Sequence, residues 1–240
     1  MAGKNTATVG GRPCVAWTIE HAQETRGLAR VVVSTDDPKV SEVARAMGAE
    51  VVARPGALAS DGASVDDAAR HALDEIERQH GVSAAPVVIL YANVPVRPSD
   101  LSQRAIERLA ETGADSVQSF SRVGKHHPWW MARVGAHGEL LPWEGDTLFH
   151  GVYRRQMLPP AYIPDGGVMA VTRRALRREI AGVPDGPHAF LGRDRRAIET
   201  NEGDVIDIDA PIDLVVANAV LSSRGLSGCS SRPIVMEKSA

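Results

Sequence analysis

The stretch Arg30-Val-Val-Val33-Ser-Thr-Asp-Asp37-Pro38 decides how this chain folds. Its run of β-branched residues predicts a buried strand, and Asp37 followed by Pro38 is a residue pair that typically begins a helix. That helix should span residues 38–47, and residues 50–53 read as a second apolar strand. A strand, a helix and a strand in this order predict two parallel strands joined by a helical crossover.

The same alternation continues along the chain in both directions. Further strands are predicted at residues 87–91, 115–120 and 167–171, and further helices at residues 13–26, 64–80, 99–112, 172–180 and 211–221. The pattern predicts an α/β fold with three layers, in which a mostly parallel sheet is covered by helices on both faces. Residues 1–221 should form a single domain with a small inserted hairpin region at about residues 122–160, followed by a flexible tail at residues 222–240.

The composition is that of an ordinary globular domain of 240 residues, 43% hydrophobic and 24% charged. A net charge of −3 provides no basic field for nucleic acid. No apolar run approaches the roughly 20 residues needed to cross a bilayer, and no signal peptide is visible. Cys14 and Cys229 fit no metal or redox spacing. We therefore expect a cytoplasmic protein with neither a nucleic-acid nor a membrane partner.

A second informative stretch, Val205-Ile-Asp207-Ile-Asp209-Ala-Pro211, reads as a buried strand that leads directly into a helix. Residues two apart on a strand point to the same side, so Asp207 and Asp209 should aim together with Cα atoms about 7 Å apart. Two crowded carboxylates repel unless a cation lies between them, and Mg²⁺ holding a nucleotide phosphate is the natural candidate. Alternatively, Asp209 caps the helix and Asp213 is favoured by its dipole, but capping leaves Asp207 unexplained.

Polar residues follow several predicted strands at their carboxyl ends. They are residues 34–37, Arg54, residues 91–97 and the pair Asp207 and Asp209. Open parallel sheets bind ligands in the crevice outside the carboxyl ends of their strands. The sequence therefore predicts one active-site crevice along this edge of the sheet.

Other polar and aromatic groups have plainer interpretations. The adjacent residues His126 and His127 would point apart on a strand, so we expect a structural role for them. The arginines within residues 173–178 predict a solvated helix face, and residues 193–196 predict a surface loop. A dimer contact is the expected role of three tryptophans, Trp129, Trp130 and Trp143.

Five short motifs occur along the chain in a fixed order. They are Ala16-Trp-Thr-Ile-Glu20, Val31-Val-Val-Ser-Thr-Asp-Asp37, Arg54-Pro55 with Leu58-Ala-Ser-Asp61, Tyr153-Arg-Arg-Gln156 with Leu158-Pro159, and Ile206-Asp-Ile-Asp209. With these motifs in register over roughly residues 3–221, the chain resembles the acylneuraminate cytidylyltransferases, or CMP-sialic acid synthetases. Each motif alone is weak, and the five together are specific to the family but not to one substrate.

The resemblance implies a Rossmann-like nucleotidyltransferase sheet, a homodimer formed around the inserted region, and Mg²⁺ as cofactor. It implies that CTP and an acidic 2-keto-3-deoxy sugar, a sialic-acid-like nonulosonate, give a CMP-sugar and pyrophosphate. It assigns the metal to Asp207 and Asp209, and catalytic roles to Asp207, Asp209 and Arg155. Substrate contacts are implied for Lys4, Asn5, Arg54, Ser64, Tyr91, Asn93, Arg154, Gln156 and Asp165.

The chain departs from the family pattern at its beginning. The family opens with a strand and a loop that holds the triphosphate, whereas here only Met1-Ala-Gly-Lys-Asn5 matches the end of that loop. A parallel sheet without this central strand would expose two unpaired edges. Either residues upstream of Met1 supply the strand, or the chain has lost its grip on phosphate.

Three further departures concern the sugar more than the nucleotide. Tyr91-Ala-Asn-Val-Pro95 replaces Gln-Pro-Thr-Ser-Pro, Asp165-Gly166 replaces Asn-Gly, and Ser64-Val65 replaces a pair of serines. A carboxylate at Asp165 would repel an acidic sugar unless a cation compensates. Two alternatives therefore stay open: a nucleotidyltransferase for a different sugar, or an inactive nucleotide-binding homologue.

Overall fold

The computed structural model describes residues 1, 3–60, 62–83 and 85–225. Of the predicted tail, residues 226–240 lie outside the described residues, and so does Cys229. The last helix extends through Ser223, two residues beyond its predicted end. None of the helices in the described ranges combines the length and the apolar character that crossing a membrane requires.

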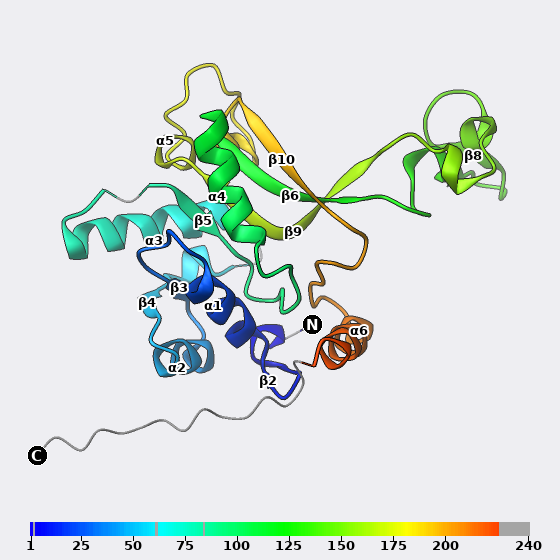
Figure 1. Ribbon diagram of the computed structural model, residues 1–240. Helices are drawn as coiled ribbons and strands as arrows, with labels where there is room; N and C mark the ends of the chain where they lie inside the picture. The colour runs from blue at the N-terminus through cyan, green and yellow to red at the C-terminus, as the bar shows by residue number, and fades with distance from the viewer. Residues whose placement is uncertain (2, 61, 84, 226–240) are drawn as a thin grey trace, which may run out of the picture.

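A four-stranded sheet forms the centre of the molecule (Figure 1). Its strands, in spatial order, are β10 (Arg195–Thr200), β6 (Ser116–Arg122), β9 (Tyr162–Val171) and β5 (Val87–Ile89). β10 runs parallel to β6, while β9 runs antiparallel to both of its neighbours, β6 and β5. A separate parallel pair consists of β3 (Val32–Thr35) and β4 (Glu50–Ala53). The predicted mostly parallel sheet is thus confirmed, with β9 as its reversed strand.

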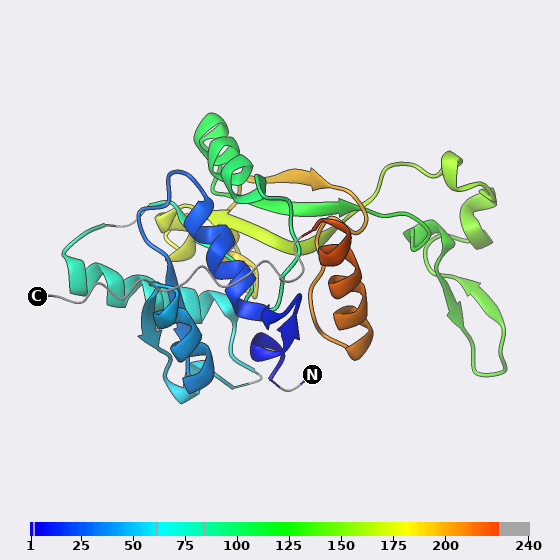
Figure 2. The same ribbon diagram turned by 60° about the horizontal axis from the view of Figure 1, so that its bottom comes forward.

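Helices cover both faces of the sheet, which confirms the three layers predicted from the sequence (Figures 1 and 2). On one face α4 (Leu101–Thr112) packs against β6, β9 and β10 through Leu101, Val117 and Ile198. On the other face α3 (Val65–His80) and α5 (Arg173–Leu176) pack against β5 and β9. Two more helices, α1 (Cys14–Glu24) and α2 (Pro38–Ala46), cover the β3–β4 pair, and α6 (Pro211–Ser223) packs beside α1.

The helix boundaries follow from local chemistry that the sequence already displays. The Asp37 carboxylate accepts a hydrogen bond from the Lys39 amide, and Pro38 occupies the first turn of α2. Ser64 caps α3 in the same way by accepting from the Asp67 amide. Gly81 ends α3 at φ 65°, a backbone conformation that glycine adopts without steric cost.

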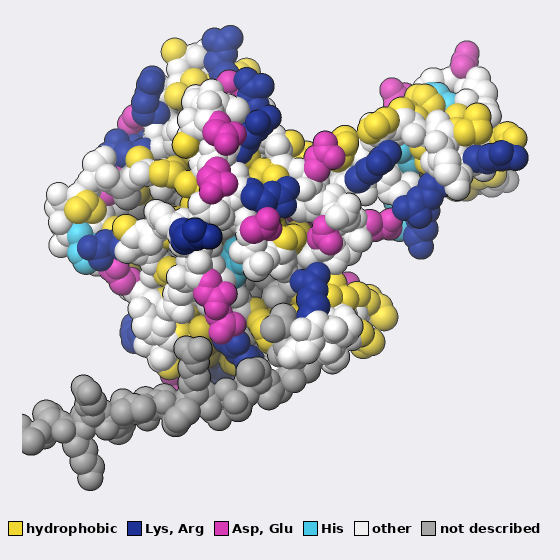
Figure 3. Space-filling model, in the orientation of Figure 1, with side chains coloured by type: hydrophobic (Ala, Val, Ile, Leu, Met, Phe, Trp, Pro, Cys, Tyr) yellow, Lys and Arg dark blue, Asp and Glu magenta, His cyan; other side chains and the backbone are white. Residues whose placement is uncertain are grey.

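The inserted region is an arm that projects away from the sheet (Figures 1 and 2). It carries a two-stranded antiparallel hairpin of β7 (Ala132–Val134) and β8 (Leu140–Pro142) where the sequence predicts one. Figure 3 shows hydrophobic side chains gathered on this arm. Those exposed on it are Met131, Val134, Leu140, Leu141, Trp143, Phe149, Tyr153 and Met157.

His127 has the structural role expected of it. Its side chain is only 2% exposed, and its Nδ1 accepts a hydrogen bond from the Trp129 amide. Its Nε2 lies 3.0 Å from the carbonyl oxygen of Pro159. The imidazole thus joins the two chain segments at the base of the arm.

Two expectations about arginines are met only in part. Arg174 and Arg178 are exposed as predicted, but the arginine face also pairs with acids, because α5 packs on the acidic side of α3: Arg173 and Arg177 bind Glu77, and Arg178 binds Asp66. Of the predicted loop at residues 193–196, the last two residues belong to β10, which starts at Arg195. β10 is an edge strand that alternates charged and apolar residues weakly, so its sequence carries little strand signal.

Candidate active site

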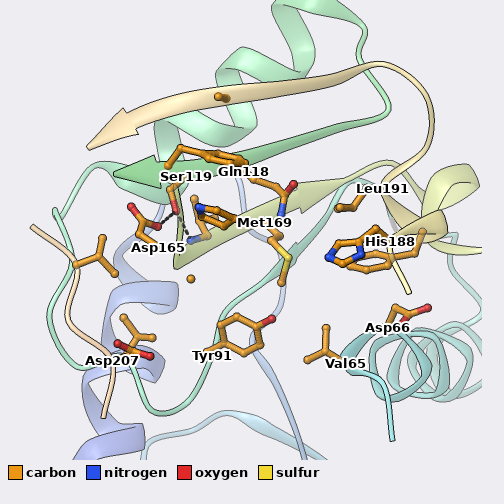
Figure 4. A pocket seen from close by; sticks show the side chains of 18 of the residues that line it. Val65, Asp66, Tyr91, Gln118, Ser119, Asp165, Met169, His188, Leu191 and Asp207 are labelled. Atoms are coloured by element: carbon orange, nitrogen blue, oxygen red, sulfur yellow. Dashed lines mark hydrogen bonds between the residues drawn. The ribbon is translucent and has the colours of Figure 1, made fainter. Parts of the chain in front are cut away.

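A cavity of about 1050 Å³ lies between the central sheet and the segment that precedes α6. Lys4, Asp207 and Asp209 line one end of it. Val65, Asp66, His188 and Leu191 lie at the other end, with Tyr91 and Met169 between the two (Figure 4). The cavity therefore brings together part of the predicted crevice, residues from 91–97 and the pair Asp207 and Asp209, whereas residues 34–37 and Arg54 do not line it.

The acidic segment is not the strand that the sequence predicts. Only Ile206 forms a bridge, with Val96, and the amides of Ile206 and Ile208 donate to the carbonyls of Val96 and Asn93. The segment pairs with an irregular loop rather than with a strand, which is why no ladder forms. The alternation survives, because Ile208 is fully buried whereas Asp207 and Asp209 are exposed toward the cavity.

Asp209 does not cap the following helix. The carboxylate of Asp213 does so, because it accepts hydrogen bonds from the amides of Asp209 and Ala210 at 2.9 and 2.7 Å. The side chain of Asp209 instead binds Lys4, with Nζ and Oδ1 2.6 Å apart, and the Asn93 amide reaches the same oxygen at 3.4 Å. The capping interpretation of Asp209 is therefore wrong, and its carboxylate faces the cavity in an ion pair with Lys4.

The two carboxylates are electrostatically unequal. Burial, then a hydrogen bond to Asp209 and the charge of Asp209, raise the pKa of Asp207. A hydrogen bond from Lys4 lowers the pKa of Asp209. Burial aside, Asp207 resists ionisation because its neighbour Asp209 is already charged. A cation bound between the two carboxylates would remove this repulsion.

The residues present fit Mg²⁺ bound together with a phosphate. Asp207 and Asp209 supply two carboxylates, and Asn93 adds an amide beside them. Within the described ranges, no cluster of three or more His, Cys, Asp or Glu side chains could enclose a metal. Mg²⁺ commonly binds one or two carboxylates and takes its remaining ligands from water and substrate phosphate, so a pair is sufficient.

Asp165, also on the cavity wall, is held by protein donors. Its Oδ1 accepts from the Ser119 hydroxyl (Figure 4) and from the Gly167 amide, and its Oδ2 accepts from the Thr200 hydroxyl at 2.5 Å. These contacts tie β6, β9 and β10 together at the cavity. Direct contact between Asp165 and a substrate stays a prediction.

A buried arginine supports the loop that replaces the family's Gln-Pro-Thr-Ser-Pro segment. Arg97 is 7% exposed, and its Nη2 donates to the carbonyl of Tyr91 at 3.2 Å. Burial lowers the pKa of Arg97 to about 10, so its guanidinium stays charged at neutral pH, and the charge of Asp165 favours that state. Arg97 therefore places a buried positive charge within the loop at residues 91–97, which the sequence identified only as a range.

Some predicted site residues lie outside the cavity lining. Arg154, Arg155 and Gln156 are at the base of the arm, where Arg155 pairs with Glu202 at 3.0 Å. Arg54 folds back on β3, with its Nε 3.3 Å from the Ser34 hydroxyl. Asn5 lies in the short turn Lys4–Thr6, and only its neighbour Lys4 reaches the cavity. The cavity does bring together Lys4, Ser64, Tyr91, Asn93, Asp165, Asp207 and Asp209.

The cavity also has walls that the sequence analysis missed. Gln118, His188, Arg195 and Arg196 line it, and all but His188 lie on β6 or β10. A strand prediction for residues 195–200 would have indicated that the two arginines lie on the sheet beside the cavity, but the sequence pattern of these residues did not support one. No local signal in the sequence marks His188.

A model of the family described as Cytidylyltransferase matches residues 1–128, which is more than half of the chain. An N-acylneuraminate cytidylyltransferase of Streptococcus agalactiae serotype III (strain NEM316) is 29% identical over 181 residues, covering 75% of this chain and 42% of the relative. The chain thus spans less than half the length of that relative. A CMP-N,N'-diacetyllegionaminic acid synthase of Legionella pneumophila (strain Philadelphia 1) is 27% identical over 223 residues and matches over 92% of this chain and 90% of its own.

Solved structures share the fold. The structure of a CMP:2-keto-3-deoxy-manno-octonic acid synthetase complexed with CTP superposes with a TM-score of 0.64 at 18% identity, covering 93% of each chain. A 4-diphosphocytidyl-2C-methyl-D-erythritol synthase superposes with the same TM-score, 0.64, at 14% identity. At these identities the superpositions establish the fold and nothing finer.

Proposed function

Because this chain belongs to the cytidylyltransferase family, we propose that it transfers CMP from CTP to an acidic 2-keto-3-deoxy sugar of the nonulosonate type, with release of pyrophosphate. The observation that carries the proposal is the pair Asp207 and Asp209 beside Lys4, at one end of a cavity of about 1050 Å³. Carboxylates for a metal next to an ammonium for phosphate are what a nucleoside triphosphate requires.

In this reaction the sugar hydroxyl attacks the α-phosphorus of CTP. A new phosphorus–oxygen bond forms as the bond to the β-phosphate oxygen breaks, and pyrophosphate leaves in line. Such a transfer depends on positioning and charge neutralisation and needs no covalent protein intermediate. Asp207 and Asp209 would hold Mg²⁺, which when bound would neutralise phosphate charge. Lys4 would exchange its contact with Asp209 for a contact with phosphate.

The acidic sugar is proposed because the relatives' names agree on that class. Their names specify an N-acylneuraminate, a diacetyllegionaminate or a 3-deoxy-manno-octulosonate, which are all 2-keto-3-deoxy acids. At the end away from the carboxylate pair the cavity wall carries His188 (Figure 4), and Arg195 donates a hydrogen bond to the His188 carbonyl. The one acid labelled at that end in Figure 4, Asp66, is neutralised by Arg70 and Arg178. An anionic substrate is electrostatically compatible with that end.

The test is pyrophosphate release from CTP and Mg²⁺ with N-acetylneuraminate, N,N'-diacetyllegionaminate and 3-deoxy-manno-octulosonate in parallel. We expect release with one of the two nine-carbon acids, and little release when ATP, GTP or UTP replaces CTP. Release with the eight-carbon acid alone would refute the nonulosonate assignment. Release with none of the three, in a protein that binds CTP by calorimetry, would favour a nucleotidyltransferase for a different sugar.

We also propose a homodimer formed through the arm. Val134, Trp143 and Tyr153 are 72%, 57% and 75% exposed, and apolar side chains gathered on one exposed surface are typical of interaction sites. Light scattering should give twice the mass of one chain. Trp143→Glu should shift the mass toward one chain, whereas Thr112→Glu, which adds the same charge at the end of α4 and away from the arm, should leave it unchanged. A monomer at every concentration would refute the dimer.

A further inference from the structure

A turn at residues 91–94 brings Asn93 to the acidic segment before α6. The amide of Val94 donates to the carbonyl of Tyr91 at 3.3 Å and closes the turn. A turn of this kind is four residues long, so Asn93 occupies its third position, at the corner. The place of Asn93 in the molecule therefore depends on where this turn is held.

Asn93 holds the acidic segment on both sides of Ile208. Its backbone carbonyl accepts from the Ile208 amide at 2.8 Å, and its side-chain amide donates to the Ile208 carbonyl at 3.3 Å. Ile208 is fully buried and stands between Asp207 and Asp209 in the chain. The two peptide groups that flank Ile208 are thus fixed by one residue, so the position of Asn93 sets the direction of the two carboxylates.

Arg97 holds the turn at the carbonyl that closes it. Its Nη2 donates to the Tyr91 carbonyl at 3.2 Å, and the side chain is only 7% exposed. The Thr18 hydroxyl also lies near this oxygen, at 3.1 Å, but its single proton can go instead to the Val94 carbonyl at 3.2 Å. A guanidinium is planar and directs its N–H groups rigidly, so Arg97 is the better directed of the two donors.

The burial of Arg97 is unfavourable for the stability of the fold. Its Nε and Nη1 are buried, and neither has a hydrogen-bond partner among the described residues. A buried donor without an acceptor lowers stability, and a buried charge lowers it more strongly. Stability therefore does not account for this side chain, whereas the position of the turn does.

We propose that Arg97 is a positioning residue for the carboxylate pair. Its guanidinium fixes the turn, the turn fixes Asn93, and Asn93 fixes the backbone on both sides of Ile208. Asp207 and Asp209 are thereby held side by side, so that both can reach one divalent cation. The catalytic consequence rests on the proposed function, whereas the geometric part does not and is tested separately.

The geometric part is tested by amide hydrogen exchange of Arg97→Met, read by NMR at Ile208. Methionine keeps an unbranched apolar stem but removes the donor, so the turn should loosen and the Ile208 amide should exchange about tenfold faster. The amide of Val117, in β6 between β10 and β9, reports global unfolding and should be unchanged. Arg104→Met is the matched control: it removes an arginine donor from the Glu199 carbonyl of β10, at 3.0 Å, and should leave Ile208 unchanged.

The catalytic part is tested by the Mg²⁺ concentration that gives half-maximal pyrophosphate release. Arg97→Met should raise this concentration about tenfold, as the loss of a group that orients a metal ligand does, and should leave the melting temperature nearly unchanged. The double variant Arg97→Met/Asn93→Ala should need no more Mg²⁺ than the more impaired single variant, because Arg97 acts through Asn93. Arg97→Lys keeps a cation without the planar fork, so it should move both measurements in the same direction by a smaller factor, and it serves if Arg97→Met does not fold.

The positioning role is overturned if Ile208 exchanges at the native rate in the Arg97 variant that folds, or if Arg104→Met speeds it equally. A lower melting temperature with an unchanged Mg²⁺ requirement would mean that Arg97 only supports the fold. Additive effects in the double variant would mean that Arg97 does not act through Asn93. Absence of pyrophosphate release from the native protein with every sugar would refute the proposed function instead, and exchange at Ile208 would still decide the geometric part.

Discussion

Two acidic corners of the same cavity have opposite surroundings. At the corner formed by β6, β9 and β10, Asp165 accepts three hydrogen bonds from Ser119, Gly167 and Thr200. At the corner before α6, Asp207 and Asp209 crowd each other, and Lys4 is the cation that binds Asp209. A carboxylate whose oxygens are satisfied by the protein stabilises the scaffold, whereas a crowded pair is poised to bind an external cation.

The largest effect should follow removal of one charge from the crowded corner. Asp207→Asn keeps the shape of the side chain but removes one of the two carboxylates proposed to hold Mg²⁺, and the charge stabilisation by such an ion is worth several kcal/mol. We expect CMP-sugar formation to fall at least about 100-fold, with circular dichroism unchanged. Initial rates of pyrophosphate release over a range of Mg²⁺ concentrations would measure this.

A neighbour in the same segment supplies the control for this variant. Asp213→Asn removes the carboxylate that caps α6, at a cost of about 1 kcal/mol of stability, and should leave the rate per folded molecule nearly unchanged. If Asp213→Asn lost as much activity as Asp207→Asn, the loss could not be assigned to the pair Asp207 and Asp209, because any carboxylate of this segment would have the same effect.

The next largest effect should be on stability at the satisfied corner. Asp165→Ala leaves the Ser119 and Thr200 hydroxyls and the Gly167 amide without their acceptor, and we expect the free energy of unfolding to fall by about 2 kcal/mol. Thr200→Val removes one of these donors and should cost about 1 kcal/mol. Urea denaturation would measure both. The comparison would be wrong if Asp165→Ala lowered the rate as much as Asp207→Asn does and left the free energy of unfolding unchanged. Asp165 would then serve the reaction rather than the scaffold.

A smaller effect concerns pH. The hydrogen bond from Lys4 is the main cause that lowers the pKa of Asp209, so Lys4→Met should raise that pKa. If the carboxylate pair must ionise to work, the acid limb of the kcat/KM profile, which reports the free enzyme, moves to higher pH. Lys39→Met, on the outside of α2, is the control and should leave the limb in place. An unmoved limb in Lys4→Met would mean that the ion pair is absent from the enzyme before substrate binds.

The sequence predicts the parts of the fold that local chemistry determines. Asp37 and Ser64 are caps with recognisable neighbours, and the apolar strand at residues 50–53 is found where predicted. It does not predict β10, whose pairing with β6 comes from tertiary contact and not from a clear alternation of its residues. Propensity is a weak guide for edge strands, because packing against neighbours decides them.

The site was predictable to a similar extent. Residue spacing places Asp207 and Asp209 on one side even though the segment is not a strand, because an extended backbone alternates in either case. Spacing could not reveal that Asp213 takes the cap, since Asp209 and Asp213 both suit a helix start. Residue spacing also could not predict where Arg155 lies. The residue is at the base of the arm, where it pairs with Glu202, and it does not line the cavity.

The smallest expected effect is a gain in stability from the variant that loses activity. The pKa of Asp207 is raised above its usual value of 3.8, so the fold disfavours its ionised form. Its contribution to stability is therefore fully present below pH 3.8 and is lost as the pH rises through the raised pKa. The amide introduced by Asp207→Asn carries no charge, so this variant should melt slightly higher than the native protein at pH 7 without Mg²⁺, and the difference should vanish in acid. Melting temperatures at pH 7 and pH 3.5 would show this, and a lower melting temperature at pH 7 would mean that the corner is not strained by charge.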